Sequence, residues 1–570
     1  MSSIKQPRNA PSADTEAVLL GVFLSVVVVA GGGIYATAHL SALVDDRPSP
    51  GANPFTVVIG TFSGDVPWTG SSTVVAVLLG VVLLVLTAGT MALLLRRRGA
   101  RGRVDRAASR MGRGRAIAPL THKSTSGAAK RLGVAAGPGL PIGRSVATGA
   151  ALYQDWEAVS IDIAGPRTGK TTSRVIPAIL AAPGAVVTTS NKRDVVDATR
   201  GVRAHEGRVW IFDPQGLTGE APTWWWNPLS YVTDETKAQA LAEIFATASR
   251  RADARTDAYF DSAALELLGN LLLAAALDSR PITDVYVWIT DPNDDTAAGI
   301  LDRHNYPLPA ASVRGVVGSP DKQRAGVFGT AQQVASFLTN RQATRWVTPA
   351  GGGLHFSPEA FVATTDTLYS LSKEGRGNAG PLVTALTVAV CEAAEEHAKR
   401  QPSGRLQVPM VVVLDEAANV CRWSELPNLY SHYGSRGVNM LTFLQSWSQG
   451  VEAWGREGMR KLWSASNVKV YGGGVSEVEF LSELAQLIGD YSHVESSTSY
   501  QRSSGRSVSR QHRTDKILDV ADLAALDRGR MVVLASGAVP VLARSQPWYE
   551  GPDREAVQAS INTYAPGTAQ

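Results

Sequence analysis

The residues with the clearest capacity for chemistry form a short loop, residues 164–171, which reads AGPRTGKT. The apolar, β-branched residues 158–163 before it are typical of a buried strand, and a helical stretch follows through residue 179. In such a unit a glycine lets the backbone approach a ligand, and successive N–H groups at the helix N-terminus hold phosphate groups. The pattern predicts a phosphate-binding loop, with Ala164 in place of its usual first glycine.

The residue types within this loop predict what each would hold. Lys170 would reach the terminal phosphates of a nucleotide, and the Thr171 hydroxyl would bind Mg²⁺. ATP and Mg²⁺ are therefore the predicted cofactors. The predicted nucleotide-binding residues are Ala164, Gly165, Pro166, Arg167, Thr168, Gly169, Lys170, Thr171 and Thr172.

A second strand that ends in acidic residues is expected beside this loop. Residues 410–414 read MVVVL and lead directly into Asp415 and Glu416. At the carboxyl end of a strand Asp415 would hold Mg²⁺ through water, and Glu416 would orient or deprotonate the attacking water. An isolated Asp-Glu pair would more simply be a helix N-cap, but the phosphate loop makes the metal and water roles the better interpretation.

Several further stretches read as strands of the same sheet. Helical sequence separates many of them, which predicts an α/β fold of the RecA-like P-loop type, with a mostly parallel sheet covered on both faces. Ligands bind such sheets at the carboxyl ends of the strands, where Asp213 and Gln445 each follow a predicted strand. Gln445 is the better candidate to sense the terminal phosphate or orient water, the alternative being an ordinary loop glutamine. The remaining predicted strands are residues 185–189, 209–212, 367–371, 440–444, 467–471 and 531–535.

Apolar residues recur at helical spacing between residues 233 and 345, which predicts an all-α insertion domain. The insertion would divide the P-loop ATPase domain into a first part, residues 151–232, and a second part, residues 346–548. A polar tail, residues 549–570, follows the second part.

Two uncharged apolar runs, residues 17–38 and 73–95, are long enough to cross a membrane as helices. Arginines gather directly after the second run, whereas the loop between the runs is acidic. This bias predicts that residues 1–16 and the ATPase domain face the cytoplasm, and that the protein is a multi-pass protein of the cell membrane. A cleaved signal peptide in place of the first span is the alternative.

The net charge of +4 conceals a strongly basic stretch. Residues 96–144 hold thirteen Lys or Arg and a single acid, Asp105. We interpret residues 96–150 as a basic juxtamembrane linker attracted to anionic headgroups, with contact to nucleic-acid phosphates as the alternative. The Gly- and Ser-rich residues 123–143 are expected to be a linker. Arg502 to Arg513 is either a mobile loop on DNA phosphates or a solvated connector.

Only two cysteines occur, so a disulfide scaffold is not expected.

With these features in place, the chain resembles the TraG/TraD-type coupling proteins of type IV secretion, the TraM-recognition-domain family. These are membrane-anchored DNA-transfer ATPases of bacterial conjugation. Besides the two nucleotide motifs, the resemblance is carried by VWIFDP at 209–214, WNPL at 226–229, YFD at 259–261, LDEAAN at 414–419, GSRG at 434–437, FLQS at 443–446 and the closing strands near 532–541.

The resemblance implies a function for this chain and roles for its residues. Lys170 and Thr171 would bind ATP and Mg²⁺, Asp415 and Glu416 would support hydrolysis, and Arg436 would be an arginine finger reaching the nucleotide of a neighbouring subunit. It further implies a homo-hexamer that moves DNA, single-stranded with attached relaxase, towards the secretion channel proteins. From spacing alone, Arg436 would be an exposed loop arginine. Trp224 to Trp226 is no hallmark of the family and is expected to pack in the core or an interface.

Three other functions are alternatives to this one. An FtsK- or HerA-like double-stranded DNA translocase would carry a DNA-reading domain after the ATPase domain, where only a polar tail is evident. A type VII secretion ATPase would carry several ATPase modules, whereas one phosphate loop is found. A nucleotide-binding membrane scaffold without turnover is disfavoured because Lys170, Thr171, Asp415 and Glu416 are all present.

Overall fold

The computed structural model describes residues 13–99, 102–249, 257–349, 353–373, 379–501 and 505–567. The chain forms two compact units, Met1–Gly102 and Arg103–Gln570. Each is described by itself.

Two long helices dominate the first unit, α1 (Ala13–Val44) and α3 (Gly70–Gly99). Both hold a segment long and apolar enough to cross a membrane, Val27–Val44 in α1 and Gly70–Thr90 in α3. The spans begin and end at different residues from those predicted, but both predicted spans correspond to long apolar helices. A polar network joins the helix ends: the Asp45 carboxylate accepts from Thr69 at 2.9 Å, Ser71 at 2.6 Å and Arg47 at 2.6 Å.

The loop between the two long helices contains a short helix that the sequence analysis did not predict, α2 (Pro54–Ser63). Asn53 caps it by accepting a hydrogen bond from the Phe55 N–H at 3.0 Å, and a proline occupies its first turn, both common helix-start features. Phe55 and Phe62 are 78% and 80% exposed, so this helix presents bare apolar side chains.

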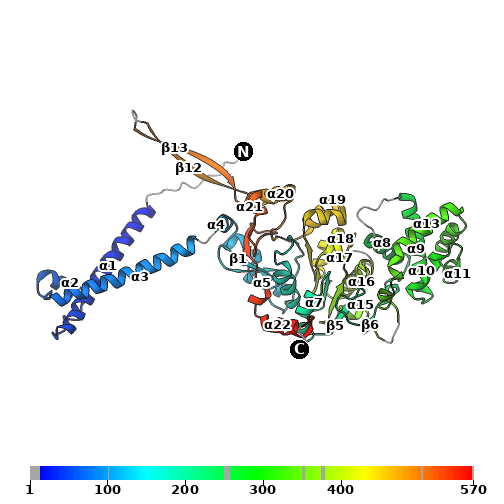
Figure 1. The fold of residues 1–570 in the computed structure, drawn as a ribbon, viewed down its shortest axis with the longest axis horizontal. Helices are drawn as coiled ribbons and strands as arrows, with labels where there is room; N and C mark the ends of the chain where they lie inside the picture. The colour runs from blue at the N-terminus through cyan, green and yellow to red at the C-terminus, as the bar shows by residue number, and fades with distance from the viewer. Residues whose placement is uncertain are drawn as a thin grey trace. The chain divides into compact units, whose positions relative to one another are not determined.

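The second unit is built on an eleven-stranded sheet (Figure 1). Its seven strands from β11 to β5 are mutually parallel, and the other four pair antiparallel at one side. The predicted mostly parallel α/β sheet is therefore confirmed. In spatial order the strands are β2 (Ala151–Gln154), β1 (Leu140–Ser145), β15 (Val541–Arg544), β14 (Arg530–Ala535), β11 (Val468–Tyr471), β3 (Ser160–Ile163), β10 (Val438–Leu444), β9 (Met410–Leu414), β4 (Val186–Ser190), β8 (Thr367–Leu371) and β5 (Val209–Phe212).

Alternate residues of the central strands enter different apolar clusters. Val412 and Leu414 of β9 belong to one cluster, whereas Val411 and Val413 belong to another. Because successive strand residues point to opposite faces, both faces of the sheet are covered. The helices around the sheet are α5 (His122–Arg131), α6 (Ile176–Leu180), α7 (Asp194–Arg203), α15 (Pro358–Phe361), α16 (Gly380–Lys399), α17 (Ala417–Val420), α18 (Leu426–Ser435), α19 (Trp447–Ala465), α20 (Val478–Ile488), α21 (Val520–Ala524) and α22 (Arg554–Tyr564).

A group of helices lies at one end of the second unit, within the stretch for which an insertion is predicted (Figure 1). One of them, α9 (Ala258–Leu277), is apolar enough to span a membrane, but most of it is buried among its neighbours. The other helices of the group are α8 (Glu235–Ser249), α10 (Ile282–Thr290), α11 (Thr296–Arg303), α12 (Pro307–Val317), α13 (Asp321–Val334) and α14 (Arg341–Thr344).

The tryptophan cluster lies where the chain enters and leaves this helical group. Trp224 and Trp226 are 5% and 0% exposed, and the backbone N–H of Trp226 donates to the Trp346 carbonyl at 2.9 Å. Trp224 packs edge-on against Trp346 with 5.6 Å between ring centroids, and it also contacts Phe356. The cluster therefore packs in the core, where it holds the segment that enters the helical group against the segment that leaves it.

Two stretches have more regular structure than the sequence indicates. Residues 123–143, expected to be a linker, contain most of α5 and the start of β1. Leu140 and Ile142 are buried because β1 pairs with β15, far along the chain.

The Arg-rich segment, expected to be a loop or a connector, belongs instead to a long hairpin of β12 (Asp490–Gln501) and β13 (Gly505–Lys516). Arg502 lies outside the described residues.

Candidate nucleotide-binding site

The sheet brings the phosphate loop and the acidic pair to one edge. Strand β10 pairs in parallel with both β3 and β9, with Leu444 opposite Ile163 and Thr442 opposite Leu414. The loop follows β3 and the acidic pair follows β9, so both stand at the carboxyl ends of neighbouring strands. This is the edge at which open α/β sheets bind ligands.

Four of the five predicted catalytic residues make contact there. The Lys170 ammonium forms an ion pair with the Glu416 carboxylate, and its Nζ lies 3.5 Å from Asp415 Oδ1. Gln445 Nε2 donates to the other Glu416 oxygen at 2.7 Å. Asp415 and Glu416 are only 4% and 6% exposed, so these charges interact with little screening by water.

Glu416 adopts a backbone conformation that is unusual for its residue type. Its φ of 53° and ψ of 43° lie in the left-handed region, at the start of α17. Non-glycine residues held there carry strain, and such residues gather at functional sites. The turn makes the chain pass from β9 into α17 within two residues, which leaves the Glu416 carboxylate beside Lys170.

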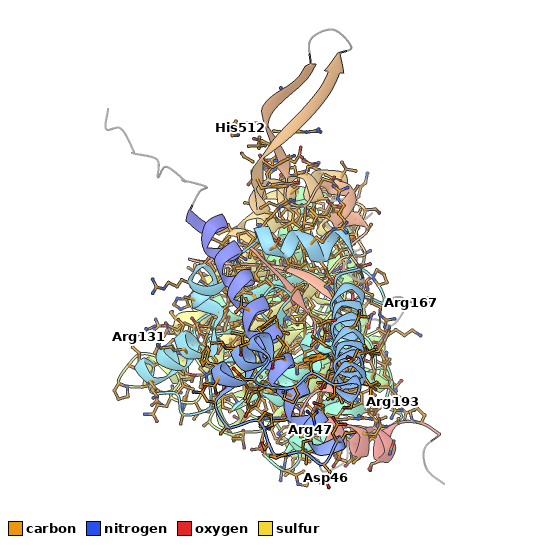
Figure 2. All side chains as sticks on the ribbon, turned by 90° about the vertical axis from the view of Figure 1, so that its left-hand side faces the viewer. Asp46, Arg47, Arg131, Arg167, Arg193 and His512 are labelled. Atoms are coloured by element: carbon orange, nitrogen blue, oxygen red, sulfur yellow. The ribbon has the colours of Figure 1, made fainter. Side chains whose placement is uncertain are left out.

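The phosphate loop is shaped by positive backbone angles and side-chain hydrogen bonds. Gly169 has φ 92° and Arg167 has φ 61°. Thr168 Oγ1 donates to the Gly165 carbonyl at 2.8 Å, and Thr172 Oγ1 donates to the Gly169 carbonyl at 3.0 Å. Arg167 is exposed (Figure 2), and Thr171 begins a π-helical turn that α6 continues. Every predicted nucleotide-binding residue thus lies in one turn between β3 and α6.

A glycine run that the sequence analysis missed supports this loop. Gly473 accepts a hydrogen bond from the Gly165 N–H at 2.9 Å, and a β-carbon on Gly165 would lie 2.0 Å from the Gly474 carbonyl oxygen. A β-carbon on Gly474 would lie 2.9 Å from the Thr168 side chain. Both segments therefore need glycine for close backbone approach. The signal available in the sequence was three consecutive glycines directly after a predicted strand.

A buried ion pair fixes the helix that follows the loop. Arg174 Nε donates to the Asp162 carboxylate at 2.8 Å, and both side chains are 3% exposed. Arg174 also donates to the Pro141 carbonyl of β1 at 2.5 Å. The pair ties the first turns after the loop to β3 and β1, which limits movement of the loop.

The residues present fit a bound Mg²⁺. Asp415 Oδ1 is buried and has no hydrogen-bond partner within the described chain, since 3.5 Å to Lys170 exceeds a normal N–H to O distance. Mg²⁺ characteristically binds one or two carboxylates together with substrate phosphates. No group of three His, Cys, Asp or Glu residues with metal-site geometry occurs among the described residues.

Burial raises the pKa of Asp415 from 3.8 to about 6; the Lys170 charge opposes the shift and the Glu416 charge adds to it. A raised pKa means that the folded protein binds this proton more tightly than the unfolded chain does. Protonated Asp415 therefore stabilises the folded protein fully below pH 4. This stabilisation is lost as the pH rises to about 6, which lowers the free energy of unfolding by about 3 kcal/mol.

We therefore expect Asp415→Asn to flatten the loss of stability between about pH 4 and pH 6. The measurement is the free energy of unfolding of the wild type and the variant across this range, without nucleotide or Mg²⁺. The difference between the two proteins isolates Asp415 from other titrating groups. Parallel curves for the two proteins would contradict this account.

Two predicted residues lie elsewhere. Arg436 follows α18, where its guanidinium donates to the Gly404 carbonyl at 2.8 Å, close to the amino end of β10. Gln445 follows the opposite end of the same strand. Eight residues of extended chain put the two ends of the strand about 25 Å apart. Asp213 accepts hydrogen bonds from Leu217 and Thr218 and so closes a turn at the edge strand β5.

Comparison with known proteins gives a family match over one segment of the chain and a fold for most of it. Residues 409–528 match the family described as the TraM recognition site of TraD and TraG. This segment holds Asp415, Glu416, Arg436 and Gln445 together with the β12–β13 hairpin. No curated protein sequence matches the chain.

Solved structures of a bacterial conjugative coupling protein share the fold. The trigonal form of TrwBdeltaN70 in complex with sulphate matches with a TM-score of 0.53 and 14% identity, covering 69% of this chain and 86% of that one. The plasmid coupling protein TrwB in complex with the non-hydrolysable ATP analogue ADPNP matches with a TM-score of 0.52 and 15% identity, over 69% and 86% of the two chains. At these identities the likeness establishes the fold.

Proposed function

We propose that the chain, whose residues 409–528 match the TraM recognition site of TraD and TraG, is a membrane-anchored ATPase of conjugative type IV secretion. It binds a DNA substrate, single-stranded with an attached relaxase, and passes it to the secretion channel by hydrolysing ATP. The observation that carries the proposal is the buried contact of Lys170 with Asp415 and Glu416 at the carboxyl edge of a RecA-like sheet.

The geometry suggests how these residues act during hydrolysis. Lys170 binds the terminal phosphates of ATP, which compete with Glu416 for its ammonium group. Glu416, released from the ion pair but still held by Gln445, accepts a hydrogen bond from water and orients it for attack. Mg²⁺, held by Thr171 and Asp415, would neutralise charge on the phosphates when bound.

The apolar helices of the first unit support a place in the cell membrane. The proposed outward loop and cytoplasmic ATPase domain rest on the arginines that begin at Arg96, directly after the second apolar run. The proposed assembly is a homo-hexamer, and the proposed role of Arg436 requires that subunits contact one another around a ring. Because Arg436 lies at the opposite end of β10 from its own site, it can contact a nucleotide only across a subunit interface.

We expect the full chain to hydrolyse ATP faster in the presence of DNA, and Arg436→Ala to remove this activity. The control is a mixture of Arg436→Ala and Lys170→Ala chains, neither active alone. In a mixed ring about a quarter of the interfaces combine an intact Lys170 with an intact Arg436 from the neighbour, so partial activity returns. The measurement is phosphate release by each variant and by the equimolar mixture.

The outcomes separate the alternative functions. An inactive mixture would remove the arginine finger and leave a local structural role for Arg436. Nucleotide binding without any turnover in the wild type would favour the membrane scaffold. Stimulation by duplex but not by single-stranded DNA would favour an FtsK- or HerA-like translocase.

A further inference from the structure

Helix α2 lies in the loop that joins the two long apolar helices, and its two sides differ in what covers them (Figure 1). The helix packs against α1, and Val57 and Gly60 on one side are buried. On the other side Ile59 is 65% exposed, and Phe55 and Phe62 are more exposed still. These three residues are spaced four and three apart, so they share one face of the helix. We call them the apolar face of α2.

Two contacts with α1 set the depth at which α2 begins. The Tyr35 hydroxyl donates to the Ala52 carbonyl at 3.4 Å, and His39 Nε2 lies 3.1 Å from the carbonyl oxygen of the residue before Ala52. The chain therefore returns to the level of Tyr35 two residues before α2 starts. Tyr35 lies within the apolar run 17–38 and also within the apolar segment Val27–Val44 of α1. With either set of limits, α2 begins at a level where α1 is still in the membrane.

The other end of α2 lies towards the polar network that joins the ends of α1 and α3. The Gly60 carbonyl accepts from the Val66 N–H at 2.9 Å, three residues before Thr69, which donates to Asp45. Asp45 lies ten residues beyond the level of Tyr35, about 15 Å along a helix. Helix α2 is thus placed between the apolar part of α1 and the polar ends of the spans. The interface between hydrocarbon and headgroups occupies this position, and it is about 5 to 8 Å thick on each side of a membrane.

The residues around α2 are compatible with contact with lipid. Residues 48–64 contain no Asp, Glu, Lys, Arg or His. Each of the three hydroxyls of α2 donates within the chain: Thr56 to the carbonyl three residues before it at 2.9 Å, and Thr61 to the carbonyl four residues before it at 2.8 Å. The third, Ser63, donates to the Asp65 carboxylate at 2.6 Å. Polar groups that are satisfied in this way can be removed from water at little cost.

We propose that α2 lies in the outer interface of the membrane, with Phe55, Ile59 and Phe62 inserted among the lipid acyl chains. A helix in this position buries its apolar face about 5 to 10 Å into the boundary between headgroups and acyl chains. Trp68, which precedes α3 and is 47% exposed, belongs to the residue type that is enriched at this level. The proposal rests on the membrane placement in the proposed function and adds a third segment that contacts lipid.

A protein partner matches the apolar face of α2 less well than lipid does. Protein interfaces surround an apolar centre with a polar rim and form about one hydrogen bond per 100–200 Å². The hydroxyls of α2 already donate within the chain, and residues 48–64 supply no charged side chain for such a rim. Lipid acyl chains need neither feature. Because basic residues are absent as well, the contact does not depend on anionic headgroups.

The test places a spin label at single positions of α2 in the full chain, in nanodiscs of neutral phosphatidylcholine. Both natural cysteines are buried, so a cysteine introduced at an exposed position is the one that reacts with the label. The accessibility of each label is measured to oxygen, which dissolves in lipid, and to a nickel chelate, which stays in water. Thermal unfolding and ATP hydrolysis of each labelled chain check that the fold is retained.

The labelled positions compare the apolar face with the flanks of the same helix. Phe55→Cys, Ile59→Cys and Phe62→Cys place the label on the apolar face. Thr56→Cys and Ser63→Cys are the matched controls, since both positions are exposed and each directly follows a residue of that face. We expect the ratio of oxygen to chelate accessibility to be several-fold higher on the apolar face than at the two flanking positions.

Three results would overturn the proposal. Higher access of the chelate to the apolar face than to the flanks would show that this face is in water. Labels on the apolar face that are shielded from both reagents would show that protein covers it, either a second copy of the chain or a channel protein. A ratio that rises on the apolar face only after anionic lipid is added would assign the contact to headgroups rather than acyl chains.

A label on α3 distinguishes failure of this proposal from failure of the membrane anchor. Leu84 is 68% exposed and lies within the apolar segment Gly70–Thr90, so Leu84→Cys should give high access to oxygen and low access to the chelate. The opposite result at Leu84 would remove the membrane anchor and the interfacial position of α2 with it. The expected result at Leu84, without the high ratio on the apolar face, would remove the interfacial position alone.

Discussion

Lys170→Ala is expected to lower kcat for ATP hydrolysis by about 100- to 1,000-fold, the cost of removing one preorganised charge from a reacting centre. Lys170 is the cation that contacts both buried carboxylates at the carboxyl edge of the sheet. Its ammonium group is placed to neutralise charge that develops on the transferred phosphate. The measurement is steady-state phosphate release by the full chain with saturating DNA.

The same substitution is expected to destabilise the protein at neutral pH. Without Lys170, Asp415 and Glu416 remain buried with no cation between them, and an uncompensated buried charge costs about 3 to 5 kcal/mol. Because the pKa of Asp415 is already raised to about 6, protonation relieves part of this cost at lower pH. The loss of stability should therefore be larger at pH 8 than at pH 5.

Lys170→Arg is the control that separates lost chemistry from lost stability. It keeps the positive charge and can still pair with both carboxylates, so the free energy of unfolding should stay near that of the wild type. Turnover should still fall, because a planar guanidinium does not reproduce the compact ammonium group. If Lys170→Ala hydrolysed ATP within tenfold of the wild-type rate while folded, the assignment of this site would be wrong.

The parts of this site that could be predicted are those with a strong local pattern. Strands β5, β8 and β9 begin and end at the predicted residues. The clearest pattern is that of β9, whose sequence MVVVL is the continuous apolar run typical of a buried parallel strand. Once β3, β9 and β10 are assigned as parallel strands, the rule that ligands bind at the carboxyl edge places Lys170, Glu416 and Gln445 together without coordinates.

The parts that could not be predicted depend on partners far along the chain. Strand β1 lies in a glycine-rich stretch that gives no clear strand pattern. It is defined by its pairing with β15, where Arg144 lies opposite Arg544. The β12–β13 hairpin is mostly polar, so hydrophobic alternation gives no clear signal, and only its pairing register reveals it. The role of Gly474 follows from its contact with Gly165, which no local pattern contains.

Glu416→Gln is expected to lower kcat by about 100- to 10,000-fold, the range for loss of a positioned general base. An amide keeps the size of the side chain and can still accept the hydrogen bond from Gln445, but it cannot take a proton from water. The control is Glu477→Gln, the same chemical change at a carboxylate that accepts from the Trp447 and Ser448 N–H groups at the start of α19. That variant should keep kcat within a few-fold of the wild type.

Glu416→Gln is also expected to bind ATP more tightly than the wild type, and this distinguishes the mechanism from simple damage to the site. In the structure the Glu416 carboxylate holds Lys170, so incoming phosphates must displace it. An amide competes less well for the ammonium group because it carries no charge, and the displacement costs less. Kd for a non-hydrolysable ATP analogue, measured by calorimetry, should therefore fall while kcat falls. A variant with weaker analogue binding would show that Glu416 supports the fold of the site rather than water activation.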